Sequence, residues 1–179
     1  MEKPSNCIDI FEFSSRYGSV TESSARTIIS NVITSCSAMY DQRVFHRDIK
    51  DENVLLNPTT LETFIIDFGC AAEATNQHQE FRSFSGTPEF TCPEYYITGR
   101  YEQEKSTVWS IGCLLYVLLF GDIPFEDMDQ ITRGDRYKVR DLYTHASVQM
   151  CPTIGKLAVI LIFYFSLTNQ CYLPRWNQF

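Results

Sequence analysis

The sequence lacks the patterns that mark several common functional classes. Its eight glycines include no GxGxxG or GxxxxGK spacing, which excludes a glycine-rich loop that cradles phosphate groups. Its seven cysteines are scattered and include no CxxC pair, so a zinc site of that kind is not expected. No basic segment followed by an apolar one opens the chain, so we expect neither a secretory signal nor disulfides. Scattered, reduced thiols favour the cytoplasm or the nucleus.

Excess positive charge and a long apolar run are also absent. Lys and Arg number 15 against 22 Asp and Glu, and a net charge of -7 opposes binding to nucleic acid phosphates. The apolar run at residues 157–167 is too short for a bilayer, which takes roughly 20 residues. We therefore expect no nucleic acid partner and no membrane span. The hydrophobic content of 44% over 179 residues instead indicates a folded domain with a real core.

The apolar pattern predicts a mainly α-helical protein with a few short β-strands. Apolar residues recur at helical spacing after Thr21, which is a suitable N-cap. Residues 108–120 are apolar on every face and predict a helix buried in the core. Short strands are predicted at 44–45, 54–56 and 64–66, and the turn-rich residues 57–60 join the last two as a hairpin.

The chain changes character near Gly134. Residues 1–134 contain ten basic and 20 acidic residues, whereas residues 135–179 contain five basic and two acidic ones. The periodic patterns also fade beyond this point. We predict a domain over residues 1–134 and a divergent tail over residues 135–179 that does not share its fold, with residues 157–167 aggregation-prone if exposed.

A run of polar residues between apolar strands carries the predicted chemistry. The segment at 46–53 reads HRDIKDEN, and Asp67-Phe68-Gly69 follows the next strand. Phosphoryl transfer needs a positioned hydroxyl, neutralised phosphate charge and metal ligands. Asp48 would accept the hydroxyl proton, Lys50 would stabilise the phosphate, and Asn53 with Asp67 would hold Mg²⁺ through hard oxygen ligands. These residues could instead be solvated loop groups, but their joint spacing disfavours that interpretation.

These two motifs resemble those of the protein kinase family. HRDIKDEN matches the catalytic-loop pattern H-R-D-x-x-x-x-N, and the DFG sequence matches the magnesium-binding motif. Cys92-Pro93-Glu94 stands where the family has A-P-E. Lys50 and the pair Gly86-Thr87 resemble the serine/threonine branch, which implies ATP and Mg²⁺ as cofactors, protein Ser or Thr as substrate, and a substrate-binding place for Thr87.

A closer resemblance is to the Pim kinases, over residues 1 to about 134. It is carried by Met1-Glu2-Lys3-Pro4, by HRDIKDEN, and by VWSIGCLLY followed by GDIPFE. The resemblance implies that Glu2 lies in the hinge beside adenine and that Leu55 and Ile66 lie under the ring. It also implies substrates with basic residues near the Ser or Thr, read by Asp9, Glu12, Glu52 and Asp122. Isolated surface acids are usually only solvating charge, which is the competing interpretation for these four.

The resemblance implies a kinase C-lobe without its N-lobe, because the chain opens at the hinge and lacks the glycine-rich loop. The function expected is that of a Ser/Thr protein kinase fragment, related to the Pim enzymes and impaired in turnover. The alternative is a catalytically inactive module that binds substrates or partners. A lobe of this kind would expose apolar surface near Leu55 and Ile66, so chaperone association is also expected.

Overall fold

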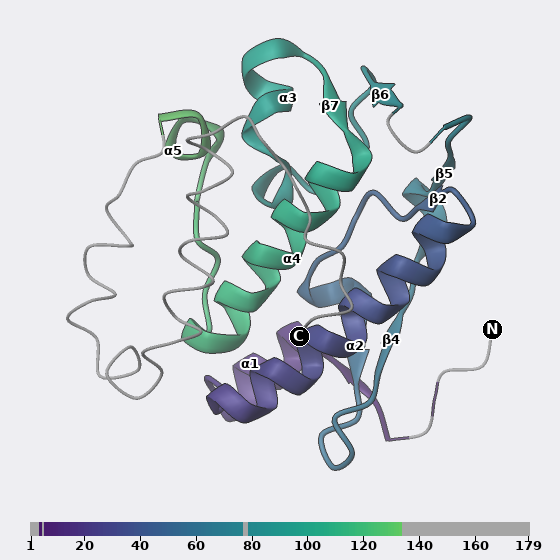
Figure 1. Cartoon of the computed structure of the whole chain (residues 1–179). Helices are drawn as coiled ribbons and strands as arrows, with labels where there is room; N and C mark the ends of the chain where they lie inside the picture. Colours follow the sequence, from purple (N-terminus) through teal and green to yellow (C-terminus); the bar gives the residue numbers. More distant parts are fainter. Residues whose placement is uncertain (1–3, 5, 77–78, 134–179) are drawn as a thin grey trace.

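The computed structural model describes residues 4, 6–76 and 79–133, and it is mainly helical with short strands (Figure 1). Glu2 and the predicted tail at 135–179 lie outside the described residues. The α-helices are α1 (Ile10–Tyr17), α2 (Glu22–Asp41), α3 (Pro93–Thr98), α4 (Gln103–Phe120) and α5 (Met128–Arg133). The strands are β1 (Ile8–Asp9), β2 (Val44–Phe45), β3 (Val54–Leu56), β4 (Thr63–Ile65), β5 (Ala72–Glu73), β6 (Glu80–Phe81) and β7 (Tyr101–Glu102). Single turns of 3-10 helix are η1 (Asp51–Asn53), η2 (Phe68–Cys70) and η3 (Pro88–Phe90).

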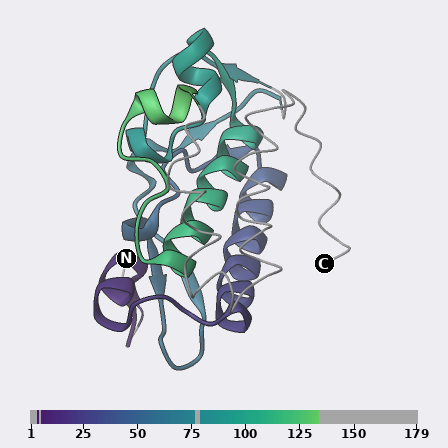
Figure 2. The same ribbon diagram turned by 90° about the vertical axis from the view of Figure 1, so that its left-hand side faces the viewer.

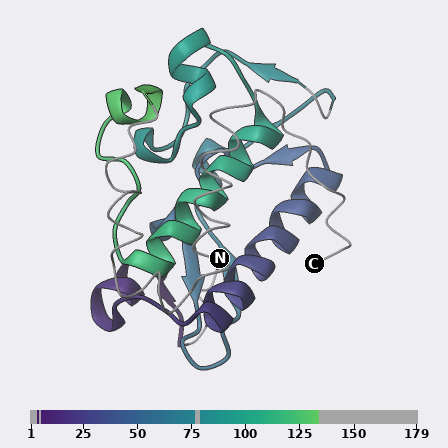
Figure 3. The same ribbon diagram turned by 60° about the vertical axis from the view of Figure 1, so that its left-hand side comes forward.

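Helix α2 begins where the sequence predicts. The hydroxyl of Thr21 accepts a hydrogen bond from the backbone amide of Ser24 over 3.2 Å, which satisfies one of the free donors of the first turn. Ala25, Ile28 and Val32 recur on one face of the helix and are fully buried. Helix α2 lies beside α4 in both rotated views (Figures 2 and 3). This pair of helices forms the centre of the domain.

Helix α4 contributes the longest run of buried residues among the described elements. It begins at Gln103, five residues before the predicted start, because the first turn is polar and carries no apolar signal. From Val108 to Leu119 every side chain position is buried. Gly121 ends the helix with φ +74, a left-handed conformation that glycine adopts without steric cost. A helix buried on all sides explains the absence of a polar face in its sequence.

Three short strands lie beside these helices in the order β1-β3-β4. Strands β3 and β4 form the predicted antiparallel hairpin, with Leu55 opposite Phe64. Strand β4 ends at Ile65, one residue before the predicted end at residue 66. Strand β2 pairs with β5, and β6 pairs with β7, so each of these four short strands is held by a distant partner. Sequence patterns do not predict β1, β5, β6 and β7, because two-residue strands have no periodicity.

The core has two parts on either side of α4. The first joins α1, α2 and β3 through residues that include Ile10, Ile28 and Leu114. The second surrounds Trp109, whose ring stacks on Phe125 at a centroid distance of 5.6 Å. It attaches η3, α3 and α5 to the other face of α4. Burying side chains of this size contributes about 1.5–3 kcal/mol each, so α4 links both parts energetically.

The exposed apolar surface expected near Leu55 and Ile66 does not include Leu55 itself. Leu55 is 4% exposed, because it lies in β3 between β1 and β4. The exposed large apolar residues of this region are Phe64 and Phe68. None of the helices in the described residues combines the length and apolar character required to cross a bilayer.

Candidate active site

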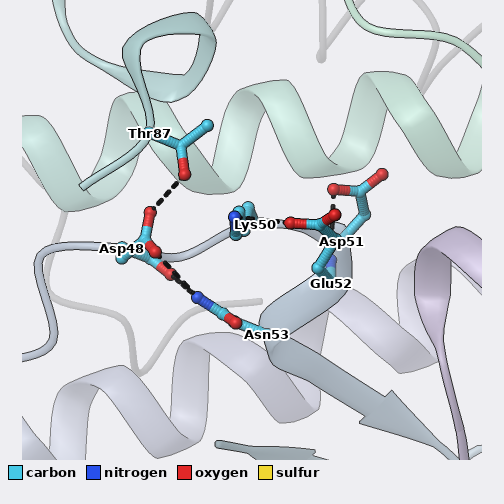
Figure 4. A network of polar contacts seen from close by, with 6 residues as sticks. All are labelled: Asp48, Lys50, Asp51, Glu52, Asn53 and Thr87. Carbon is cyan, nitrogen blue, oxygen red and sulfur yellow. Dashed lines mark hydrogen bonds and ion pairs between the residues drawn. The ribbon is translucent and has the colours of Figure 1, made fainter. Parts of the chain in front are cut away.

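Asp48 lies at the centre of the loop that leads from β2 to η1 (Figure 4). The side-chain amide nitrogen of Asn53 donates to the backbone carbonyl of Asp48 and to its carboxylate Oδ2, each over 2.9 Å. The hydroxyl of Thr87 donates to the other carboxylate oxygen, Oδ1, over 2.8 Å. The carboxylate is therefore held from two directions by segments that lie far apart in the sequence.

Thr87 reaches Asp48 because the backbone of the preceding residue, Gly86, lies very close to the loop. Gly86 has φ +117, a conformation that residues with a Cβ rarely adopt. A Cβ at this position would lie 2.4 Å from the backbone carbonyl oxygen of Arg47. Glycine is thus required here both by its dihedral angle and by the space available. The sequence shows Gly86 only as part of a motif, and no pattern in it indicates this requirement.

His46 connects this loop to the residue before Asp67. Its Nε2 lies 2.9 Å from the carbonyl oxygen of Ile66, and the amide of Asp48 donates to its Nδ1 over 3.3 Å. These partners require a neutral ring with the proton on Nε2. Burial lowers the pKa of His46, against the weaker raising effect of the hydrogen bond to Ile66. The histidine supports both motifs and is 2% exposed, so it is positioned to hold the loop rather than to contact a substrate.

Asn53 and Asp67 are brought together by the same short stretch of backbone. The amide of Ile66 donates to the carbonyl of Asn53 over 3.0 Å, so Ile66 is bonded at both its amide and its carbonyl. The next residue, Asp67, has φ 61 and ψ 76, a left-handed conformation that aspartate tolerates better than most residues. Its Oδ1 accepts from the amide of Gly69 over 3.1 Å. This turn sets the direction of the Asp67 carboxylate.

The oxygen atoms of Asn53 and Asp67 suit a bound Mg²⁺. The side-chain nitrogen of Asn53 makes both bonds to Asp48, so its side-chain oxygen remains for a metal. Asp67 keeps a second carboxylate oxygen and is exposed. Mg²⁺ is commonly held by one or two such groups together with substrate phosphates. Among the described residues, no group of three or more His, Cys, Asp or Glu lies close enough together to hold a metal ion.

Lys50 lies among carboxylates next to Asp48. Its ammonium forms an ion pair with Glu52 over 2.5 Å. Burial alone lowers the pKa of Lys50, but the hydrogen bond to Glu52 and the charges of Asp48, Glu52 and Asp51 together raise it. Lys50 is therefore a fixed cation beside the loop. Glu52, predicted to read a basic substrate, already has this partner and keeps a side chain that is 58% exposed.

The residues predicted to contact adenine are only partly placed. Leu55 is buried in β3, and Ile66 is half-buried immediately after β4, the strand that neighbours β3 in the same sheet. Glu2 lies outside the described residues. The ring position implied for Leu55 and Ile66 stays a prediction.

The remaining predicted substrate-binding acids have local roles as well. Asp9 caps α1, where its Oδ1 accepts from the amide of Glu12 over 2.7 Å. Glu12 forms an ion pair with Arg16 one helical turn later. Asp122 follows the end of α4 and is exposed, and it accepts from the amide of Ile123 over 2.8 Å. Helix α1 packs against both η1 and α4, so these acids lie on neighbouring elements.

A second cluster next to Asp48 was not predicted in this form. The guanidinium of Arg47 contacts the carbonyl of Ser83 and the hydroxyl of Tyr101, and it lies over the ring of Phe81. The sequence shows Arg47 only as the second residue of the HRDIKDEN segment and does not indicate these contacts. No spacing rule connects Arg47 with Tyr101, because the contact depends on the pairing of β6 with β7.

A loop that presents Asp48, Lys50 and the side-chain oxygen of Asn53 beside a DFG turn is the arrangement of a protein kinase. Residues 2–163 match the family model for the protein kinase domain, and the chain belongs to this family. It is 39% identical to serine/threonine-protein kinase pim-2 of Danio rerio over 133 residues, or 74% of this chain and 42% of that protein. It is 35% identical to serine/threonine-protein kinase prk-2 of Caenorhabditis elegans over 156 residues, or 87% of this chain and 35% of that protein.

The chain thus spans less than half the length of these two relatives. The range matched by the family model continues past Gly134 into the predicted tail. The boundary at Gly134 therefore stays a prediction, since residues 134–179 lie outside the described part of the structure.

Proposed function

We propose that this chain carries the catalytic loop, residues 46–53, and the activation segment, residues 67–94, of a Pim-like Ser/Thr protein kinase. Such a kinase transfers the γ-phosphoryl group of ATP to protein Ser or Thr. The observation that carries the proposal is the arrangement around Asp48. Its carboxylate is held by Asn53 and Thr87 through both oxygens, on a loop that also presents Lys50. Both relatives reported above are named serine/threonine-protein kinases, which supports the choice of hydroxyl substrate.

Each side chain has one role in this proposal. Asp48 accepts the proton of the substrate hydroxyl, and the bonds from Asn53 and Thr87 orient its carboxylate for that purpose. Lys50, held as a cation, attracts the phosphate that is being transferred. Asn53 and Asp67 would hold Mg²⁺, which when bound supplies positive charge that neutralises the phosphate oxygens. Thr87 also borders the place of the substrate residue.

The substrates we propose are proteins with basic residues near the Ser or Thr. Four acids on α1, η1 and the end of α4 support this proposal through their charge. They are Asp9, Glu12, Glu52 and Asp122. A basic substrate residue would compete with Lys50 for Glu52. We further propose a cytoplasmic or nuclear location, and chaperone association through the exposed Phe64 and Phe68.

The experiment is a phosphate-transfer assay of the full chain with Mg²⁺ and ATP. The substrates are an Arg-rich peptide with one Ser and the same peptide with Tyr in its place. We expect slow phosphate transfer, as for a fragment impaired in turnover, to the Ser peptide only, and transfer lower by about 10²–10⁴-fold with the Asp48→Asn variant. If the Ser peptide binds the chain but receives no phosphate, the inactive binding module replaces the enzyme in our proposal.

A further inference from the structure

Arg47 makes a set of contacts to the activation segment, residues 67–94, that the proposed chemistry does not use. Its Nη2 donates to the carbonyl of Ser83 over 3.0 Å and to the hydroxyl of Tyr101 over 3.3 Å. The hydroxyl of Tyr101 donates in turn to the carbonyl of Ser83 over 3.2 Å. Three groups from three parts of the chain thus form a closed set of hydrogen bonds. We call these residues the Arg47 triangle.

Aromatic rings fix the geometry of the Arg47 triangle. Phe81 lies directly opposite Tyr101 in the β6–β7 pair. The guanidinium carbon of Arg47 is 5.2 Å from the centre of the Phe81 ring, within the range of a cation–π contact. On its other side the ring of Tyr101 meets Tyr95 of α3, edge to face, at 5.6 Å. Tyr101 is 6% exposed, so packing holds its ring in addition to the hydrogen bonds of its hydroxyl.

The backbone of Arg47 also depends on this arrangement. Arg47 has φ 70, a left-handed conformation that is uncommon outside glycine and costs free energy. Its carbonyl faces Gly86, and its neighbour Asp48 accepts from Thr87. The Nε of Arg47 is buried and has no hydrogen-bond partner among the described atoms, so the polar contacts of the side chain to Ser83 and Tyr101 both depend on Nη2. Loss of one partner of Nη2 would therefore weaken the attachment of the whole segment.

An arginine facing the serines of such a segment is where a phosphate group would bind if one were added. In this chain three neutral groups already contact the guanidinium: a carbonyl, a hydroxyl and an aromatic ring. The contact with Ser83 is made by its backbone carbonyl, so it needs no modification of the side chain.

We propose that Tyr101 is a positioning residue that holds the activation segment on Arg47 without a phosphate group, and thereby keeps Thr87 on Asp48. The effect of Tyr101 on catalysis rests on the proposed function, whereas its effect on the attachment of the activation segment does not. Tyr101 itself does not contact Asp48 and acts only through Arg47 and the segment. Phosphorylation of Ser83 or Ser85 is then not required for the segment to be ordered.

Hydrogen–deuterium exchange of the full chain, followed by mass spectrometry, tests this proposal. Tyr101→Phe removes the hydroxyl and keeps the ring that packs on Phe81 and Tyr95. We expect amides of residues 82–87 to exchange about tenfold faster in this variant, the effect of losing one hydrogen bond to a charged group. Amides within α4 should be unchanged, which separates loss of positioning from a general loss of stability. Tyr17→Phe is the matched control, because Tyr17 is 63% exposed on α1.

Two further samples test the independence from phosphate. Ser83→Ala should exchange like the wild type, because only the carbonyl of this residue is used. Wild-type protein treated with phosphatase should also be unchanged. Equal exchange of residues 82–87 in Tyr101→Phe and the wild type would overturn the proposal. Slower exchange in a wild-type fraction phosphorylated at Ser83 or Ser85, lost on phosphatase treatment, would overturn it as well.

A phosphate-transfer assay of the same samples keeps the two proposals apart. If the wild type transfers no phosphate, the proposed function fails while the exchange result still decides the role of Tyr101. If it is active, Tyr101→Phe should lose about tenfold in kcat/KM with an unchanged thermal transition.

Discussion

Asn53 holds Asp48 by two bonds from one nitrogen, to the backbone carbonyl and to carboxylate Oδ2, each 2.9 Å long. One consequence is that the side-chain oxygen of Asn53 turns away from Asp48. The residue thus orients the proposed proton acceptor and presents a metal ligand at the same time. Because Ile66 is bonded to the carbonyl of Asn53, Asp67 follows immediately beside it. The chemistry of the loop is set by these few bonds.

Asp48→Asn should lower phosphate transfer by about 10²–10⁴-fold, because the amide cannot accept the hydroxyl proton. The bond from Thr87 to Oδ1 can be kept if the amide oxygen takes that place, so the fold should survive. The measurement is the initial rate with the Arg-rich Ser peptide, alongside Asp41→Asn at the exposed end of α2 as a control. A variant with wild-type rate would mean that Asp48 is not the proton acceptor.

Asp67→Asn should abolish the Mg²⁺ dependence of nucleotide binding, because a neutral amide replaces the anionic ligand. Calorimetric titration of ATP with and without Mg²⁺ measures this effect. Glu73→Gln, an exposed change on β5, is the matched control and should behave like the wild type. Retained Mg²⁺ dependence in Asp67→Asn would show that the metal is held elsewhere.

Glu52→Ala should raise KM for an Arg-rich peptide about fivefold and leave KM for a neutral peptide nearly unchanged. The effect corresponds to about 1 kcal/mol, the upper range for an exposed ion pair, because the Glu52 side chain is largely exposed. Steady-state kinetics with both peptides separate the two cases. An equal rise for both peptides would instead point to the loss of the Lys50–Glu52 pair, with Lys50 displaced from its place.

The stability of the protein should fall as the pH drops below about 6.5. The ordinary pKa of histidine is 6.5, and burial lowers that of His46 in the folded state. The unfolded chain therefore binds more protons below this pH, which favours unfolding, whereas the full stability is present above it. The free energy of unfolding should therefore be lower at pH 5.5 than at pH 7.

Urea unfolding of the wild type and of His46→Gln over this pH range checks the prediction. Glutamine can keep a donor and an acceptor but does not titrate, so the slope with pH should become flatter. His145→Gln leaves His46 in place and is the control. An identical slope in wild type and His46→Gln would assign the pH dependence to other groups.

Deletion of residues 135–179 should leave the thermal transition no lower than before and should improve solubility. The reason is that the described core around α4 is built from residues before Gly134, and that residues 157–167 form an aggregation-prone run if exposed. Calorimetry and size-exclusion chromatography of the two chains make the comparison. A cooperative transition that disappears with the deletion would place the domain boundary after Gly134.

The sequence by itself determined those parts of the protein that depend on local order. The apolar spacing after Thr21 predicts α2, because a helix brings residues three and four apart onto one face. The continuous apolar residues of 108–120 predict the central helix. The roles of Asp48, Asn53 and Asp67 could be predicted because the chemistry needs these residue types at fixed spacing within one loop and one turn.

Tertiary structure decided everything that depends on contacts between distant segments. Thr87 meets Asp48 only because Gly86 lets two backbones approach, and Tyr101 meets Arg47 only because β6 pairs with β7. Two-residue strands and left-handed residues carry no pattern that could predict such contacts. Leu55 shows the same limit, since the pairing of β1 and β4 on either side of β3 determines its burial. Local propensity acts over a few residues, whereas these positions are set by the packing of the whole domain.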